Sequence, residues 1–167
     1  MKKLFILFVF FAGQLYAQNS NLSIVSSATS GGTWSPLLSS ATTQTTYTFT
    51  PNADNATVST AELDELLRVK ISNVIINTAC SGCTQPGQID FNSTLNSYNQ
   101  NSPTYNKTLT FNAASDVTIP NAIAMRSTTS NSSNKGSLSL VINTPVNITV
   151  TADISMANIV QTWATAI

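Results

Sequence analysis

Apolar and polar residues alternate with a period of two through much of the second half of the chain. The stretch KTLTFNAASDVTIPNAI, residues 107–123, alternates, breaks at small residues and alternates again. The stretch GSLSLVINTPVNITVTADI, residues 136–154, repeats the same two-part pattern. Because strict alternation is typical of β-strands with one buried face, each stretch predicts two short strands joined by a turn.

The repetition of this unit predicts an all-β solenoid. Ile89, Val117 and Ile148 occupy the same place in the second strand of successive units. One pair of short strands cannot bury its apolar side chains, whereas coils stacked as parallel sheets share a continuous core. We therefore expect a parallel β-helix of about three coils. The alternative is an antiparallel β-sandwich, which also has short strands at short intervals but gives no reason for a recurring paired unit.

The alternation also predicts which side chains face the core, because every second residue of a strand points to the same side. In the first strand of each unit, we expect Ile75, Leu109 and Leu138 to be equivalent. The inward side chains are expected to be Leu109, Phe111, Val117, Ile119, Leu138, Leu140, Ile148 and Val150.

Polar residues at the ends of the strands are expected to stack between coils. Asn143 should lie above or below Asn112 as a rung of a polar ladder, as amides do in stacked strands. Aligning the second strands of the units places Asp116 over Gln88 and Asn147. The aligned positions therefore stack one carboxylate between two amides.

The chain before the repeats divides into segments with different patterns. Residues 18–57 form a Ser/Thr-rich segment in which 46–50, TYTFT, alternates like a strand. Residues 58–70 carry a helical pattern and are expected to form a capping helix on the N-terminal side of the coils. Residues 71–167 are assigned to the solenoid, and we expect it to be truncated at the C-terminus because no polar capping unit is recognisable there. The alternative is that residues 157–167 are themselves the cap.

The helical segment has a start signal and an apolar face. Ser59 is a candidate N-cap, and Glu62 follows three residues later as in a capping box. Leu63, Leu66 and Leu67 share one face of the helix. So short a helix is marginal alone and must pack on an apolar surface.

The N-terminus predicts export, to a secreted or cell-surface location. Residues 1–17 have the parts of a signal peptide, with Lys2 and Lys3 before an apolar run and Ala17 at a plausible cleavage point. The run is too short to span a bilayer comfortably, so no membrane insertion of the mature chain is expected. Removing the two lysines leaves five basic and seven acidic residues, a net charge of −2. Such a chain has no basic stripe for nucleic acid.

The two cysteines, Cys80 and Cys83, are expected to form a local disulfide. Export places them in an oxidising compartment, where disulfides persist. The chain has no histidine and no second pair of cysteines, so a zinc site is not expected. Redox chemistry is rejected because no apolar helix follows Cys83.

Catalytic chemistry would have to rest on carboxylates, because the absence of histidine removes the usual triads. Asp90, Asp116 and Asp153 are the acidic residues of the repeat region, and solvated surface positions are expected for them. No catalytic residue and no cofactor is therefore assigned. Tyr98 and Tyr105, in NSYNQNSPTYN, are candidate glycan contacts because aromatic rings beside amides can stack on sugars; the alternative is an insert with two incidental aromatics.

Four stretches together resemble a known family. These are VSTAELDELLRVKISNVIIN, GQIDFNSTL, KTLTFNAASDVTIPNAI and SLSLVINTPVNITVTADI, within residues 58–154. They resemble the repeats of large secreted bacterial haemagglutinin-like proteins of the filamentous-haemagglutinin type. The resemblance implies a right-handed parallel β-helix and an adhesin-like role. Such proteins usually have many more coils than this chain shows.

The functional expectation is a non-catalytic, secreted or cell-surface β-solenoid with a structural or adhesin-like role. The alternatives are a carbohydrate-binding module and, less favoured, a polysaccharide-active β-helix enzyme. A cell-surface glycan or protein is the expected partner. An uncovered end coil would also expose strand edges, so self-association through the end coils is expected.

Overall fold

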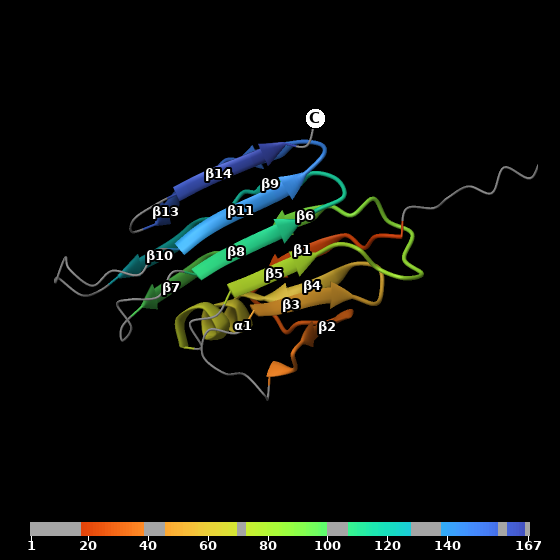
Figure 1. The fold of residues 1–167 in the computed structure, drawn as a ribbon, viewed down its shortest axis with the longest axis horizontal. Helices are drawn as coiled ribbons and strands as arrows, with labels where there is room; N and C mark the ends of the chain where they lie inside the picture. The colour runs from red at the N-terminus through yellow and green to blue at the C-terminus, as the bar shows by residue number, and fades with distance from the viewer. Residues whose placement is uncertain are drawn as a thin grey trace, which may run out of the picture.

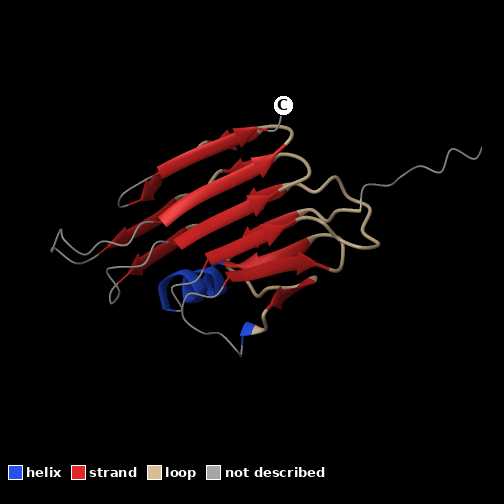
Figure 2. Cartoon of the chain, viewed as in Figure 1, coloured by secondary structure: helices blue, strands red, loops and turns tan. Residues whose placement is uncertain are grey.

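The computed structural model describes residues 18–38, 46–69, 73–99, 107–127, 138–156 and 160–165. They form a parallel β-helix of about three coils with a short helix at its N-terminal side (Figure 1). Strands dominate the structure (Figure 2). The fold class predicted from the alternation is therefore confirmed. The predicted signal peptide, residues 1–17, lies outside the described residues.

Three parallel sheets form the walls of the solenoid. The coils stack in register, so that each strand pairs with the equivalent strand of the next coil. The six-stranded sheet has the order β14 (Val160–Thr165), β11 (Leu138–Thr144), β8 (Lys107–Asn112), β5 (Asn73–Asn77), β3 (Thr46–Pro51) and β2 (Gly32–Ser35). The five-stranded sheet has the order β12 (Ile148–Val150), β9 (Val117–Ile119), β6 (Ile89–Phe91), β1 (Leu22–Val25) and β4 (Ala56–Ser59). The three-stranded sheet has the order β13 (Ile154–Met156), β10 (Ile123–Ser127) and β7 (Leu95–Asn99).

Each coil therefore has three strands, whereas the sequence pattern predicted two. The missed strands are β7, β10 and β13 of the three-stranded sheet. Most of β7 lies in 96–106, which has the composition of a polar linker. Its residues LNSYN have little alternation, and the strand is defined by its parallel pairing with β10. Tertiary pairing overrides weak local strand propensity here.

The predicted alignment of the first strands is wrong in two places. Ile75 pairs with Thr110, and Val74 pairs with Leu109. Ile75 therefore faces outward, because a shift of one residue exchanges the two faces of a strand. Leu109 pairs with Leu140. Leu138 pairs with Lys107, two residues before its predicted partner. The run NVIIN has three consecutive apolar residues and gives no alternation from which to read the face.

Most of the other inward predictions are confirmed, except that Val150 is 38% exposed and the side chain of Leu138 lies outside the described residues. Leu109, Phe111, Val117 and Ile119 have no exposed surface. The rings of Phe111 and Phe91, which belong to adjacent coils, lie 6.1 Å apart between centroids. Full burial of each such side chain contributes about 1.5–3 kcal/mol, so the stacking of coils supplies the main stabilisation.

The predicted asparagine ladder is present at the end of the six-stranded sheet. The Nδ2 atom of Asn143 donates to Oδ1 of Asn112, and Nδ2 of Asn112 donates to Oδ1 of Asn77, both at 2.8 Å. The amide of Asn112 thereby donates to one adjacent coil and accepts from the other. The ladder fixes the register of β5, β8 and β11 in addition to the backbone pairing.

The N-terminal segment contributes more to the fold than its composition indicates. Besides β3, residues 18–57 contain β1, β2 and the first half of β4. β1 lies between β4 and β6 and is parallel to both. In the six-stranded sheet, by contrast, β3 pairs directly with β5. The five-stranded sheet therefore has one additional strand, β1, between β4 and β6. The first described residues of the chain supply it.

The helix begins as predicted but is capped differently. α1 (Thr60–Asp64) continues as a π-helical turn, η2 (Glu65–Val69), and the Oγ atom of Ser59 accepts from the N–H of Ala61. The capping box is not formed, because the N–H of Ser59 donates to Oγ1 of Thr29. Glu62 instead accepts hydrogen bonds from Oγ1 of Thr29 at 2.6 Å and from Nε1 of Trp34 at 2.8 Å. A long-range contact therefore replaces the local one.

Replacing Phe111 by alanine tests the stacked core. Phe111→Ala should lower the free energy of unfolding by about 3–5 kcal/mol, because it removes a fully buried ring. The matched control is Thr110→Ala on the outward side of the same strand, which should change stability by about 0.5 kcal/mol or less. Chemical denaturation followed by circular dichroism measures both. Equal losses in the two variants would contradict the assignment of faces.

Candidate functional site

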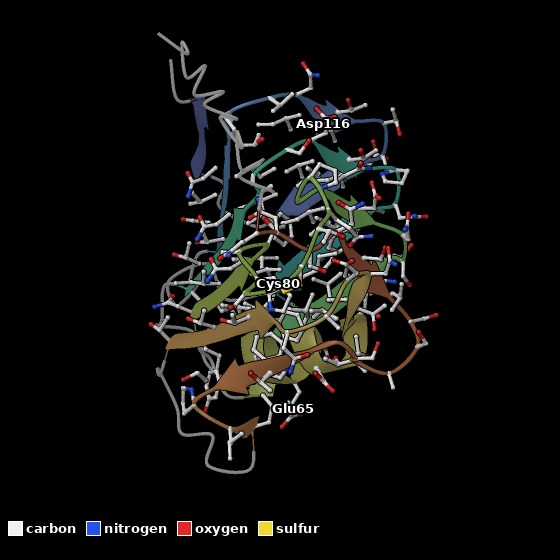
Figure 3. The ribbon with its side chains drawn as sticks, turned by 90° about the vertical axis from the view of Figure 1, so that its right-hand side faces the viewer. Glu65, Cys80 and Asp116 are labelled. Atoms are coloured by element: carbon white, nitrogen blue, oxygen red, sulfur yellow. A yellow bond between two sulfur atoms is a disulfide. The ribbon has the colours of Figure 1, made fainter. Side chains whose placement is uncertain are left out.

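The structure places the predicted site residues in different parts of the solenoid. Tyr98 lies on β7, where the register pairs it with Arg126 of β10. Tyr105 lies outside the described residues, so a joint glycan contact of the two tyrosines stays a prediction. Cys80 lies midway along the stack, whereas Asp116 lies toward its C-terminal end (Figure 3). No single cleft therefore collects these residues in the described part of the chain.

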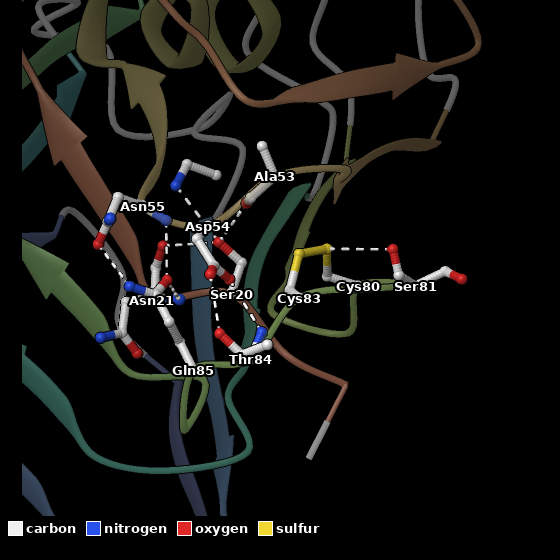
Figure 4. The surroundings of a disulfide bond; sticks show 11 residues. Ser20, Asn21, Ala53, Asp54, Asn55, Cys80, Ser81, Cys83, Thr84 and Gln85 are labelled. Atoms are coloured by element: carbon white, nitrogen blue, oxygen red, sulfur yellow. Dashed lines mark hydrogen bonds between the residues drawn. A yellow bond between two sulfur atoms is a disulfide. The ribbon is translucent and has the colours of Figure 1, made fainter. Parts of the chain in front are cut away.

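A disulfide joins Cys80 to Cys83 within the segment between β5 and β6 (Figure 4). We call this segment, residues 78–88, the disulfide loop. The Cα atoms of Cys80 and Cys83 lie 5.5 Å apart, and both side chains are buried. The loop is longer than the turns at 113–116 and 145–147, which make the same corner in the next two coils. Its additional residues contact the segment that leads into β1 and the turn between β3 and β4.

Backbone hydrogen bonds fasten the start of the described chain to the disulfide loop. The N–H of Cys80 donates to the carbonyl of Gln18 at 2.9 Å. The N–H of Ser20 donates to the carbonyl of Thr78 at 2.8 Å. Asn19 forms antiparallel bridges with both Ala79 and Gln85. The loop thus holds the segment that leads directly into β1.

Gln85 connects this loop to two other parts of the chain. Its Oε1 atom accepts from the N–H of Asn21 at 2.9 Å and from the N–H of Asn55 at 2.8 Å. Its Nε2 atom donates to Oδ1 of Asn55 at 2.6 Å. Next to it, Thr84 donates to the carboxylate of Asp54 through both its N–H and its hydroxyl, each at 3.0 Å. One loop therefore fixes β1 and the turn between β3 and β4 together.

Gly87 allows the close approach of three chain segments. Its φ angle of 86° lies in the left-handed region that favours glycine. A Cβ atom there would meet Cβ of Asn19 at 2.8 Å and Cβ of Ala114 at 2.9 Å. The carbonyl of Gly87 accepts from the N–H groups of Ala114 and Ser115, both at 3.1 Å. This position therefore joins the N-terminal segment to the following coil.

An open groove of about 540 Å³ runs over the outer face of the five-stranded sheet near β12. The predicted stacking is present there, because the N–H and Nδ2 of Asn147 both donate to Oδ1 of Asp116 at 3.1 Å. Asp90 is not among the lining residues and accepts from Nε2 of Gln88 at 2.7 Å. The groove is lined by Gln88, Asp116, Thr118, Val146, Asn147, Ile148 and Thr149. It thus presents a single carboxylate.

The outer face of the six-stranded sheet carries no charged residue over β3, β5, β8 and β11. We call this surface the uncharged face. In the five-stranded sheet the outward position of β6 is Asp90, and β10 of the three-stranded sheet contains Arg126. Lys107 belongs to β8 but is turned inward, buried, and donates from Nζ to the carbonyl of Leu67. The uncharged face consists of Thr46, Thr48, Thr50, Asn73, Ile75, Asn77, Thr108, Thr110, Asn112, Ser139, Val141 and Asn143.

The register arranges these side chains in columns. Thr48, Ile75, Thr110 and Val141 form the central column, one residue from each strand. Strands lie about 4.7–4.9 Å apart, and alternate residues along a strand are about 6.5–7 Å apart. The uncharged face is therefore a flat grid of hydroxyl, amide and aliphatic groups.

The described residues show neither a metal cluster nor a membrane span. No three of their cysteine and acidic side chains gather closely enough to hold a metal ion. None of the helices in this part of the chain is long and apolar enough to cross a bilayer. Searches of known protein families, of curated proteins and of solved structures each returned no match.

Replacing Gln85 by alanine tests the role of the disulfide loop. Gln85→Ala should lower the free energy of unfolding by about 1–3 kcal/mol, because two backbone donors lose their acceptor. Hydrogen exchange should show the largest loss of protection in β1. Gln88→Ala is the matched control, since the Gln88 side chain donates to the nearby carboxylate of Asp90 and not to β1 or the turn between β3 and β4. If protection were lost only in the disulfide loop while β1 stayed protected, Gln85 would not be holding β1 in place.

Proposed function

We propose that the chain is an exported, non-catalytic β-solenoid that acts as a structural, adhesin-like module, secreted or on the cell surface. The observation that carries this proposal is the uncharged face. It is the broad, regular outer surface of the solenoid, and its side chains are held in columns by the strand register. The grouping of one carboxylate with amides and hydroxyls in the groove near β12 also supports a binding role over acid–base catalysis.

The chemistry of the uncharged face favours a neutral, hydroxylated partner. Phosphate or sulfate groups would require cationic side chains for tight binding, and this face has none. Hydroxyl and amide groups can exchange hydrogen bonds with sugar hydroxyls, while Ile75 and Val141 cover the apolar faces of sugar rings. We therefore propose a neutral cell-surface polysaccharide as the partner of the adhesive module.

The structure also limits the entropic cost of binding at this face. Asn77, Asn112 and Asn143 are fixed by their ladder hydrogen bonds, and Oδ1 of Asn73 accepts from the N–H of Thr108 at 2.8 Å. Side chains that are ordered before binding lose less conformational freedom in the complex. A periodic ligand can therefore gain affinity from many weak contacts along the columns.

A glutamate in the central column tests this proposal. Thr110→Glu should weaken the retention of residues 18–167 on insoluble cellulose or chitin by about tenfold or more, because a neutral ligand cannot compensate the desolvated charge. Thr118→Glu, on the outer face of the five-stranded sheet, is the matched control and should bind as the unmodified chain does. Thermal unfolding verifies that both variants fold.

Three outcomes would count against the uncharged face. Equal loss in both variants would indicate a general effect of charge, and loss only in Thr118→Glu would move the site to the groove. Loss only in a variant with Tyr98→Ala and Tyr105→Ala would instead favour a carbohydrate-binding site on the tyrosine segment, the alternative retained from the sequence.

A further inference from the structure

The two ends of the solenoid differ in how they cover the core. At the N-terminal end, the buried side chains of Trp34, Leu63 and Leu66 lie over the first coil. The outer edge of β4 is also occupied, because Ser30 and Thr57 exchange backbone hydrogen bonds at 3.0 and 2.9 Å. β2 covers the edge of β3 in antiparallel orientation. This end is closed.

The C-terminal end is open in the part of the chain that the structure describes. β12 pairs with β9 on one side, and no described strand pairs with its other side. Val150 occupies the inward position that Ile119 and Phe91 occupy in the preceding coils. Those two side chains are fully buried, whereas Val150 is 38% exposed. An inward-facing core position is therefore partly exposed to solvent at this end. Val146 is also 44% exposed.

Among the described residues, the outer edge of β12 has backbone groups that no other strand pairs, and they lie beside this apolar surface. The N–H of Thr151 donates to the carbonyl of Ile119, and the carbonyl of Asn147 accepts from the N–H of Val117. Residues 147 and 151 therefore face β9. Because the backbone groups of successive residues in a parallel strand alternate between its two edges, those of Ile148 and Val150 face outward. An extended strand could pair with them directly.

We propose that a second copy of this chain pairs with the free edge of β12, giving a closed dimer joined at the C-terminal ends. The segment TPVNITVTA, residues 144–152, contains no charged residue. This matters because a two-fold contact brings two copies of this segment together, so that a charge in it would bring two like charges close to each other. At the other end of the same sheet Ser30 occupies the edge of β4, so the contact joins equivalent ends and does not stack the chains head to tail.

The arrangement of the sheets is compatible with one such two-fold axis. An axis perpendicular to the five-stranded sheet makes β12 antiparallel to its copy and keeps Val150 on the inner side in both molecules. The same axis exchanges the positions of the other two sheets. The six-stranded sheet has one more strand, β14, beyond the last coil, and the three-stranded sheet ends at β13. The six-stranded sheet of one copy, which extends further, therefore meets the three-stranded sheet of the other.

Light scattering on residues 18–167 tests the dimer. The unmodified chain should have twice the mass of the mature monomer and dissociate on dilution, and Val150→Lys should be monomeric at every concentration. Thr118→Lys carries the same charge on the outer face of the neighbouring strand β9, away from the free edge, and should remain dimeric. A monomeric unmodified chain, a dimeric Val150→Lys variant or open-ended assemblies would each overturn the proposal, and a monomer would favour another strand as partner.

Hydrogen exchange supplies a readout that does not depend on the folding of a variant. In the unmodified chain the amide of Val150 should be protected at high concentration and lose this protection on dilution. The amide of Thr151, which bonds within the same molecule, should stay protected throughout. Exchange at Val150 that is fast at all concentrations would overturn the pairing.

Discussion

The structure depends on the return of each coil to the same register. Leu109 lies directly above Val74 and below Leu140, and the strands of the other sheets follow in step. A single coil has too little apolar surface to be stable, so every inward side chain needs its counterpart in the neighbouring coil. Backbone pairing and the asparagine ladder at Asn112 enforce the same alignment. Both the buried core and the columns of the uncharged face therefore require this register.

The additional strand β1 shows how the solenoid accommodates a departure from this rule. It enters one wall only, and the disulfide loop between β5 and β6 holds the segment that leads into it. Gln85 and Gly87 make the local contacts that hold the loop in place. The helix and β2 cover one end of the solenoid, and the two proposed contact surfaces lie on an outer wall and at the opposite end.

The sequence predicted the class of fold, the inward residues around Phe111 and Val117, and the polar stacks at Asn112 and Asp116, because all of these repeat with a fixed spacing. It did not predict what lacks a local signal. β7 is polar and is defined by its pairing with β10, and the face of Ile75 is hidden in an apolar run. β1 is set by contacts with distant segments. The uncharged face was missed because it belongs to four strands at once, although the low charge of the chain was a partial signal.

Backbone contacts between β8 and β11, measured by nuclear Overhauser effects on the unmodified residues 18–167, test the central claim most directly. The parallel register predicts contacts between Thr108 and Ser139 and between Asn112 and Asn143. An antiparallel sandwich would instead place Thr108 opposite Asn143 and Asn112 opposite Ser139. Observing the second set of contacts would contradict the solenoid, and with it both proposed surfaces.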